Sequence, residues 1–419
     1  MVILVGAGLA GLACATRLEK AGVEWLLLES DSKPGGRVAT EITEEGYRLD
    51  AGFQVLLDSY PTACKLIDYD SLKPRYFQSG ALLVEENGSW ERVLNPLAHP
   101  RGLIPLLLTP SFSLQEKISF AFYAARKLIQ SDESLLLPGL GISTFNELAG
   151  MGLDGAILEK FLRPFFAGVF LESELGTDAS VFRYDLKKFV LGRALLPAGG
   201  MGNIPEQLAS RLPTHRLRYG ATVSSLHYSE NVITGIGLSD GGRVECSELV
   251  LATDEATTRR LLRLPEGRPW LGVTTLYFTG EEALYEGALL VLPQVAPGQH
   301  RLVSHFTDLT NTAPEYAPPG KRLLSATVLN PPAMDPQELA ASAQSEISLI
   351  FPGFSRWRFL KEIRIPRAIP PRDPGFLQTL LPPCIASNLL LAGDQIGPVG
   401  IESALASGIR TAELLLDRS

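Results

Sequence analysis

The chain opens with apolar runs that predict a strand, a helix and a second strand. Val2–Val5 is a short apolar run typical of a buried strand, and residues 9–21 have apolar side chains at helical spacing. Gly22 would end that helix, and Trp25–Leu28 is the second apolar run. A strand, helix and strand in this order form a right-handed unit with parallel strands. The opening therefore predicts the start of a doubly wound α/β sheet.

The kind of secondary structure that the sequence predicts changes at about residue 76, again near 195, and again near 261. The first change leads from strand-like segments to predicted helices at 114–129, 144–149, 155–165 and 186–194. The second starts a predicted β meander of strands at 216–219, 222–228, 232–238 and 243–246. The last part, 261–375, alternates strands with one helix at 335–350, and the end returns to strand, turn and helix with a helix at 402–416. We predict a nucleotide-binding domain from 1–75, 195–260 and 376–419, and an α+β substrate domain from 76–194 and 261–375.

Composition and charge exclude several classes of protein. The 419 residues are 45% hydrophobic and 20% charged, with a formal net charge of −8, so no basic footprint for nucleic acid is visible. Four scattered cysteines without CxxC spacing, and five histidines without ligand spacing, predict no metal site and a reduced, cytoplasmic protein. No apolar run approaches the roughly 20 residues of a membrane span. The nucleotide motif begins at Gly6, which leaves no room for a signal peptide before it.

The first candidate site is the glycine motif that follows the first strand, Gly6-Ala-Gly8-Leu-Ala10-Gly11. In this pattern Gly6 permits a tight turn, Gly8 lets a pyrophosphate approach the backbone, and Gly11 lets the helix pack on the strand. The helix N-terminus then offers free N–H groups to the phosphates. Glu29, at the end of the second strand, is placed to accept hydrogen bonds from a ribose diol.

A second glycine motif follows Glu29 directly and contains Gly35, Gly36 and Arg37. The two motifs together resemble the flavin-containing amine oxidase superfamily, which includes monoamine and polyamine oxidases, protoporphyrinogen oxidase, and carotenoid desaturases and isomerases. The resemblance implies a glutathione-reductase type FAD-binding domain. It also implies that the arginine lies beside the FAD phosphates, where its fork of donors suits a diphosphate.

Four later segments extend the resemblance. Residues 49–54 resemble the loop that passes close to the flavin at Gly52, and 197–201 resemble the family's second return to the flavin domain. Residues 221–223 match the strand whose backbone contacts the adenine, here at Val223. The closing motif implies four more cofactor-binding residues: Gly393, Asp394 toward the ribityl or phosphate region, and Gly400 and Ile401, whose N–H groups would face the flavin's pyrimidine edge.

The chain departs from the amine oxidases within this superfamily. They usually carry a lysine on a substrate-domain strand and an aromatic residue in the closing motif, but 272–278 has no lysine and 395–402 no aromatic residue. Cys384 does not match the family's covalent linkage, so we expect noncovalent FAD. Residues 161–170 and 363–370 instead look closer to carotenoid (phytoene) desaturase or isomerase-like and protoporphyrinogen oxidase-like proteins.

The preferred interpretation is therefore an FAD-dependent oxidoreductase that acts on a small apolar, polyene-like or tetrapyrrole-like substrate through flavin N5. An amine or amino-acid oxidase and a non-catalytic flavin-binding protein are the alternatives, and no catalytic side chain is identified. The four phenylalanines of 161–170 either line an apolar tunnel or form core, with core favoured. The apolar segments 102–108 and 120–125 either rest on a membrane surface or are buried. For His305 we favour a structural role over contact with substrate.

Overall fold

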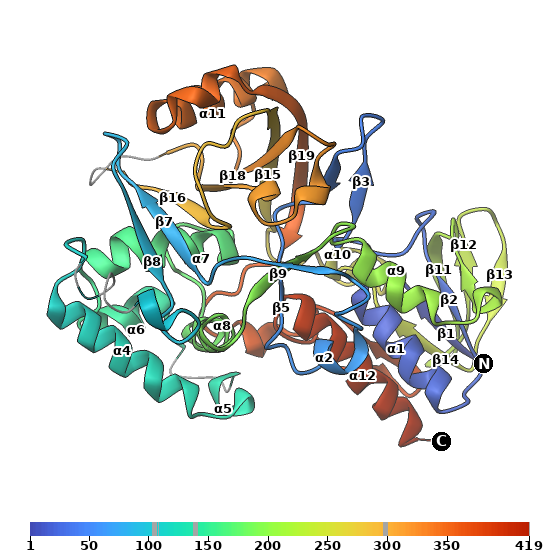
Figure 1. The fold of residues 1–419 in the computed structure, drawn as a ribbon. Coiled ribbons are helices and arrows are strands. Elements are labelled where there is room, and N and C mark those ends of the chain that lie inside the picture. The colour runs from blue at the N-terminus through green and yellow to red at the C-terminus, as the bar shows by residue number, and fades with distance from the viewer. Residues whose placement is uncertain (103–106, 108, 137–140, 296–300, 419) are drawn as a thin grey trace.

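One side of the molecule is built on a six-stranded sheet (Figure 1). The computed structural model describes residues 1–102, 107, 109–136, 141–295 and 301–418. At the centre of the sheet, β1 (Val2–Val5) pairs in parallel with β2 (Trp25–Leu28) and β14 (Glu248–Leu251). The sheet is completed by β10 (Leu217–Arg218), β21 (Leu389–Leu391) and the antiparallel edge strand β20 (Cys384–Ala386). All four residues of β1 are buried, as expected for a parallel strand covered on both faces.

Helices and a β meander cover this sheet. Helix α1 (Leu9–Lys20) packs against α12 (Ile401–Leu416), where Gly408 lies so close to the α1 backbone that a Cβ would stand 2.1 Å from the Ala10 carbonyl oxygen. The meander consists of β11 (Val223–Ser229), β12 (Val232–Leu238) and β13 (Arg243–Glu245). Two more helices lie in this part of the chain, α9 (Asn203–Ser210) and α10 (Glu255–Leu261).

The second large sheet has seven strands and lies at the other end of the molecule in Figure 1. Its order is β19 (Arg358–Ile369), β15 (Leu271–Gly280), β18 (Arg322–Leu329), β17 (His305–Asp308), β16 (Leu290–Pro293), β7 (Gly80–Val84) and β8 (Trp90–Leu94). Helix α11 (Pro336–Ile350) contributes apolar side chains to the core on one face of it. The remaining helices of this part are α4 (Leu114–Leu128), α5 (Asp132–Leu136), α6 (Thr144–Gly150), α7 (Arg163–Phe170) and α8 (Ala179–Leu191). Side chains of α4, α6, α7 and α8 share one apolar core with strands β7, β8 and β16 of this sheet.

Short elements connect the two sheets. A small sheet joins β5 (Leu56–Leu57), β9 (Ala194–Pro197) and β6 (Pro74–Tyr76), and a hairpin joins β3 (Thr40–Ile42) to β4 (Arg48–Asp50). The short helix α2 is Ala63–Leu66. The α/β fold with a doubly wound sheet, a meander and an α+β part agrees with the prediction. The strand predicted at 216–219 is not part of the meander, because it is β10 and pairs in parallel with β2 in the six-stranded sheet. The assignment of residue ranges to two domains stays a prediction.

Several sequence-based elements are wrong in detail. The helix predicted at 186–194 is α8, which begins at Ala179 because the Asp178 carboxylate caps it, accepting from the Ser180 N–H at 2.9 Å. Residues 194–197 form a strand instead. The helix predicted at 155–165 is a π-helical turn, Leu158–Leu162, followed by α7, with Pro164 in the first turn of α7.

The predictions about membrane contact are only partly addressed by the fold. In the part of the chain that the structure describes, every helix is too short or too polar to cross a bilayer. Residues 103–106 and 108 of the segment 102–108 lie outside the described residues. The segment 120–125 belongs to α4 and is not buried as a unit, since the Phe122 side chain is 60% exposed.

Candidate functional site

A single cavity of about 1070 Å³ extends from the carboxyl ends of β1 and β2 to the helices α4, α7 and α8. Every residue predicted to bind the cofactor lines this cavity except Gly11: Gly6, Gly8, Ala10, Glu29, Gly35, Gly36, Arg37, Gly52, Val223, Gly393, Asp394, Gly400 and Ile401. Segments more than 350 residues apart in the chain therefore meet at one wall. The contacts that these cavity-lining residues make with a bound cofactor remain predictions.

The first glycine motif forms a tight turn with an open side. Gly6 has a φ of +106°, and a Cβ there would stand 2.8 Å from the Ala252 carbonyl oxygen. A Cβ on Gly11 would stand 1.9 Å from the Gly6 oxygen, so Gly11 serves packing and not the cavity. A Cβ on Gly8 would meet no atom within 4 Å, and no side chain caps α1 at this residue. The open space and the free N–H groups fit a phosphate group.

Glu29 is a buried carboxylate that holds this turn. Its side chain accepts hydrogen bonds from the Ala7 N–H at 2.6 Å, and from the Ser30 hydroxyl and the Asp31 N–H at 2.9 Å. Because the protein already supplies these three donors, Glu29 is fixed at the cavity wall. A ribose hydroxyl would be an additional donor to it.

Arg37 and Asp394 bring the second and the closing motif together. The Arg37 guanidinium donates to Asp394 Oδ2 at 2.6 Å and to the Ala368 carbonyl at 3.0 Å. The other oxygen, Asp394 Oδ1, is buried and has no hydrogen-bond partner among the described residues. Burial raises the pKa of Asp394, although Arg37 opposes this rise. A buried acceptor without a donor, on a cavity wall, fits a ligand hydroxyl.

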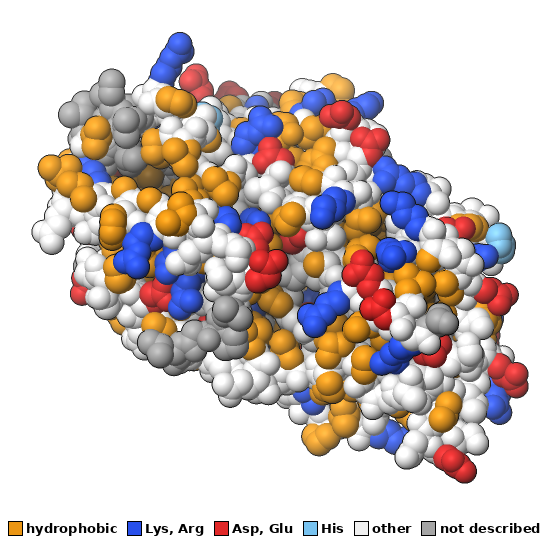
Figure 2. All heavy atoms as spheres, turned by 90° about the horizontal axis from the view of Figure 1, so that it is seen from below, with side chains coloured by type: hydrophobic (Ala, Val, Ile, Leu, Met, Phe, Trp, Pro, Cys, Tyr) orange, Lys and Arg blue, Asp and Glu red, His pale blue; other side chains and the backbone are white. Residues whose placement is uncertain are grey.

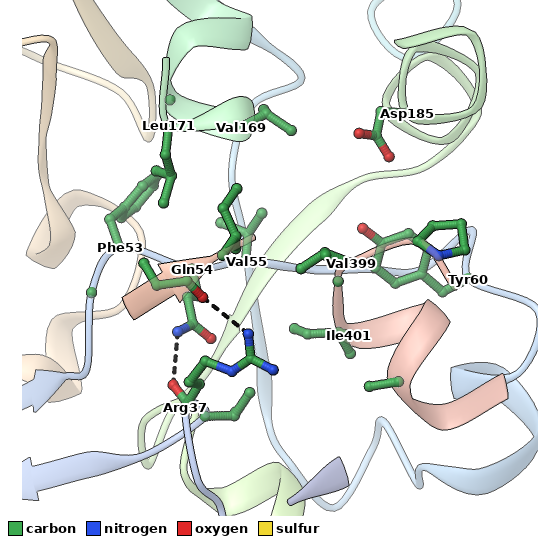
Figure 3. Close-up of a pocket in the computed structure, with 18 of the residues that line it drawn as sticks. Arg37, Phe53, Gln54, Val55, Tyr60, Val169, Leu171, Asp185, Val399 and Ile401 are labelled. Carbon is green, nitrogen blue, oxygen red and sulfur yellow. Dashed lines mark hydrogen bonds between the residues drawn. The ribbon is translucent and has the colours of Figure 1, made fainter. Parts of the chain in front are cut away.

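The loop after β4 and the start of α12 form the next part of the wall (Figure 3). The Gln54 side chain donates to the backbone oxygens of Arg37 and Ala51 at 2.9 and 3.0 Å. At Gly400, the N-cap of α12, φ is +137°, no side chain caps the helix, and a Cβ would meet no atom within 4 Å. The uncapped helix end directs positive potential at the cavity. Together with Arg37 and Gly8, these groups fit FAD, which supplies hydride or electron-pair transfer when bound.

The other end of the cavity is lined by aromatic and aliphatic side chains. Phe161, Phe165 and Phe166 line it, whereas Phe170 is fully buried in the core. Three of the four phenylalanines of 161–170 thus agree with the tunnel interpretation, and Phe170 agrees with the core interpretation. Helix α4 adds Phe120 and small alanines to the wall.

Polar side chains also line this end, among them Lys117 and Asn95. Three others bear on its chemistry, and two of these, Asp185 and Arg372, belong to no motif of the sequence. The third is His305, which is 3% exposed and lines the cavity, with its ring centroid 5.6 Å from that of Phe53. Burial lowers its pKa to about 4, so the imidazole is neutral, and Nδ1 has no partner among the described residues. The structure thus puts His305 at the cavity wall, whereas we favoured a structural role.

An aromatic side chain does lie at the closing motif, although none is in 395–402. Tyr60 comes from the loop after β5 and lies beside Val399 and Ile401 (Figure 3). Burial raises the pKa of its hydroxyl, with Asp185 and Glu402 adding to the rise. Sequence spacing within the closing motif alone could not reveal it, because the ring comes from a distant segment. On β15, by contrast, the absence of lysine holds over all ten residues.

Comparison with known proteins identifies the class. The model of the family of flavin containing amine oxidoreductases matches residues 9–416. The chain is 25% identical over 397 residues to a phytoene dehydrogenase of Streptomyces griseus, covering 86% of this chain and 75% of that protein. It is 23% identical over 460 residues to a 15-cis-phytoene desaturase of Synechococcus elongatus, covering 100% of this chain and 96% of that protein.

Two solved structures have the same fold. A putative protoporphyrinogen oxidase from Exiguobacterium has a TM-score of 0.73 at 17% identity, covering 100% of this chain and 99% of that one. A triple mutant of putrescine oxidase has a TM-score of 0.74 at 18% identity, with the same coverage. The protein is a flavin-dependent oxidoreductase. It belongs to the family of flavin containing amine oxidoreductases.

Proposed function

We propose that the protein binds FAD noncovalently and desaturates, oxidises or isomerises an apolar, polyene-like or tetrapyrrole-like substrate by hydride or electron-pair transfer at flavin N5. The observation that carries this proposal is the continuity of the cavity. The end with Arg37, Asp394 and the open glycines leads directly into an end lined by phenylalanine rings. Relatives named for phytoene support the same substrate class.

Amine or amino-acid oxidation is the alternative, and putrescine oxidase shares the fold. The substrate end disfavours it, because β15 carries no lysine, whereas the amine oxidases of this superfamily usually have one on a substrate-domain strand.

The experiment is an anaerobic comparison of three substrates with the flavin-loaded protein. Phytoene in detergent micelles, protoporphyrinogen and putrescine are mixed separately with the protein, and flavin absorbance is followed. We expect bleaching by phytoene or protoporphyrinogen and none by putrescine. Bleaching by putrescine alone would establish the amine oxidase instead. Acid precipitation of the protein should release the yellow cofactor as intact FAD, and flavin that remains in the pellet would contradict noncovalent binding.

We also propose a peripheral contact with a membrane surface through helix α4. Leu114, Ile118 and Phe122 recur every four residues and are each at least 60% exposed, so they share one helix face. On the same helix, Phe120, Ala121 and Ala124 line the cavity. Viewed from below, the end of the molecule that holds α4 displays hydrophobic side chains among lysines and arginines (Figure 2). A helix between lipid and cavity would give an apolar substrate a short entry path.

A further inference from the structure

Asp185 is an ionisable side chain on α8 without an ion-pair partner. The other charged residues of this helix are paired: Arg183 with Glu147 at 2.6 Å, and Lys187 and Lys188 with Asp132 at 3.0 and 2.5 Å. Among the described residues, Asp185 makes neither a hydrogen bond nor an ion pair. An unpartnered carboxylate in apolar surroundings lowers stability, so its presence calls for a functional explanation.

The position of Asp185 separates it from the other carboxylates of the cavity. Those are Glu29, Asp31, Asp254 and Asp394, and they lie with the nucleotide motifs. Asp185 lies toward the apolar end, near Val169 and across the cavity from Arg37 and Gln54 (Figure 3). It is therefore the carboxylate that a molecule in the substrate end would meet.

The groups near Asp185 set its pKa so that the carboxylate can accept a proton at neutral pH. Burial raises its pKa to about 6, and the positive charge of Arg372 counteracts part of that rise. The other titratable groups within reach are the hydroxyls of Tyr60 and Tyr184, whose own pKa values the Asp185 charge helps to raise. At neutral pH the carboxylate is thus ionised, and it binds a proton more strongly than an exposed aspartate does.

Arg372 is the cation whose charge acts on Asp185, and its contacts hold it in place. It is 5% exposed, its guanidinium stands 5.4 Å from the centroid of the Phe170 ring, and it donates to the Val169 carbonyl oxygen at 3.3 Å. His305 is the other titratable ring in the substrate end, but with a pKa of about 4 it is a much weaker base than Asp185. Asp185 is therefore the better proton acceptor of the two.

We propose that the Asp185 carboxylate accepts the proton that a substrate loses during desaturation. This proposal rests on the proposed function. Two adjacent carbons each lose a C–H bond: one hydrogen leaves as hydride to the oxidised flavin, and the other leaves as a proton to an Asp185 oxygen. The carbon–carbon double bond forms from the electron pair left by the proton. The substrate is oxidised by two electrons and the flavin is reduced by two, and the proton then passes to solvent.

The test compares wild type with Asp185→Asn, which keeps the shape of the side chain and removes the base. Glu133→Gln, an exposed acid-to-amide change on α5, is the matched control. The first readout needs no substrate: the infrared carboxylic-acid band is followed between about pH 4 and pH 8. Asp50 also has a pKa of about 6 and contributes to both proteins, so the difference spectrum isolates Asp185. We expect a band in the difference spectrum that disappears with a midpoint near pH 6.

The second readout is the rate of anaerobic flavin reduction by phytoene, measured on samples of equal flavin content. Asp185→Asn should reduce this rate by about 100-fold or more, the usual effect of removing a general base. Glu133→Gln should match wild type. If Asp185→Asn reduces the flavin at the wild-type rate, or if no band titrates near pH 6, the proposal is wrong while the proposed function stands. If phytoene fails to reduce the wild-type flavin, the desaturation on which this proposal rests fails, and this is seen before any variant is compared.

Discussion

Arg37 Nη2 and Asp394 Oδ2 lie 2.6 Å apart, although 357 positions separate the two residues in the chain. Arg37 belongs to the second glycine motif and Asp394 follows β21, so this ion pair joins the beginning and the end of the flavin half. The Arg37 side chain remains 39% exposed, whereas that of Asp394 is only 4% exposed. The arginine can therefore contact a ligand while it neutralises the buried acid.

Replacing Arg37 should weaken cofactor retention. Arg37→Ala removes a charged donor from the cavity wall and leaves Asp394 without its cation. A hydrogen bond to a charged group contributes about 1.5–3 kcal/mol, so the dissociation constant for FAD should rise roughly 10- to 100-fold. The measurement is the flavin-to-protein ratio after extensive dialysis. Arg356→Ala, which removes an exposed arginine paired with Glu282, is the control; equal retention in both variants would exclude Arg37 from the site.

Two glycines of the first motif should respond differently to a methyl group. A Cβ at position 8 meets no protein atom within 4 Å, so Gly8→Ala should fold normally but lose flavin, because the methyl occupies the space expected for phosphate. Gly11→Ala places a Cβ 1.9 Å from the Gly6 oxygen and should lower the melting temperature itself. Thermal unfolding together with flavin absorbance separates the two effects. A Gly8→Ala protein with full flavin content would show that no cofactor approaches this turn.

Asp185 should make the folded protein less stable as the pH rises. Its pKa in the folded state is raised to about 6, so the folded protein holds this proton more tightly than the unfolded chain does. The resulting stability is present below about pH 4 and is lost as the pH rises through about 6. Asp185→Asn should therefore be more stable than wild type at pH 7.5, by about 1–3 kcal/mol, and the difference should shrink toward pH 4.5. Chemical unfolding at both pH values checks this, and a less stable variant at pH 7.5 would contradict it.

The exposed face of α4 should govern binding to lipid. Ile118→Glu combined with Phe122→Glu places two charges on the face proposed to contact the membrane. This double variant should lose flotation with liposomes. Leu349→Glu is the control, because Leu349 is 72% exposed but lies on α11. Wild-type protein that stays off the liposomes would exclude the membrane contact, and equal loss in the control would exclude α4 as the specific surface.

The glycine motifs could be interpreted from sequence because their spacing reflects backbone geometry. Gly6 and Gly8 follow a strand directly, and local chain order already fixes the turn that they make. The substrate end could not be interpreted in this way. Asp185 is one acid among several charged residues of α8, and only the packed structure shows that its neighbours are paired and it is not. Tyr60 likewise reaches the closing motif from another segment, so no local pattern predicts it.

The central claim is that the flavin acts on an apolar substrate held in the ring-lined end of the cavity. The most direct measurement is a single anaerobic turnover of the flavin-loaded protein with one equivalent of phytoene, with product mass and flavin absorbance recorded together. The account predicts that the flavin is bleached and that the product lacks two hydrogen atoms, or that an isomer of unchanged mass forms. Recovery of unchanged phytoene with oxidised flavin, from protein whose flavin putrescine bleaches, would contradict it.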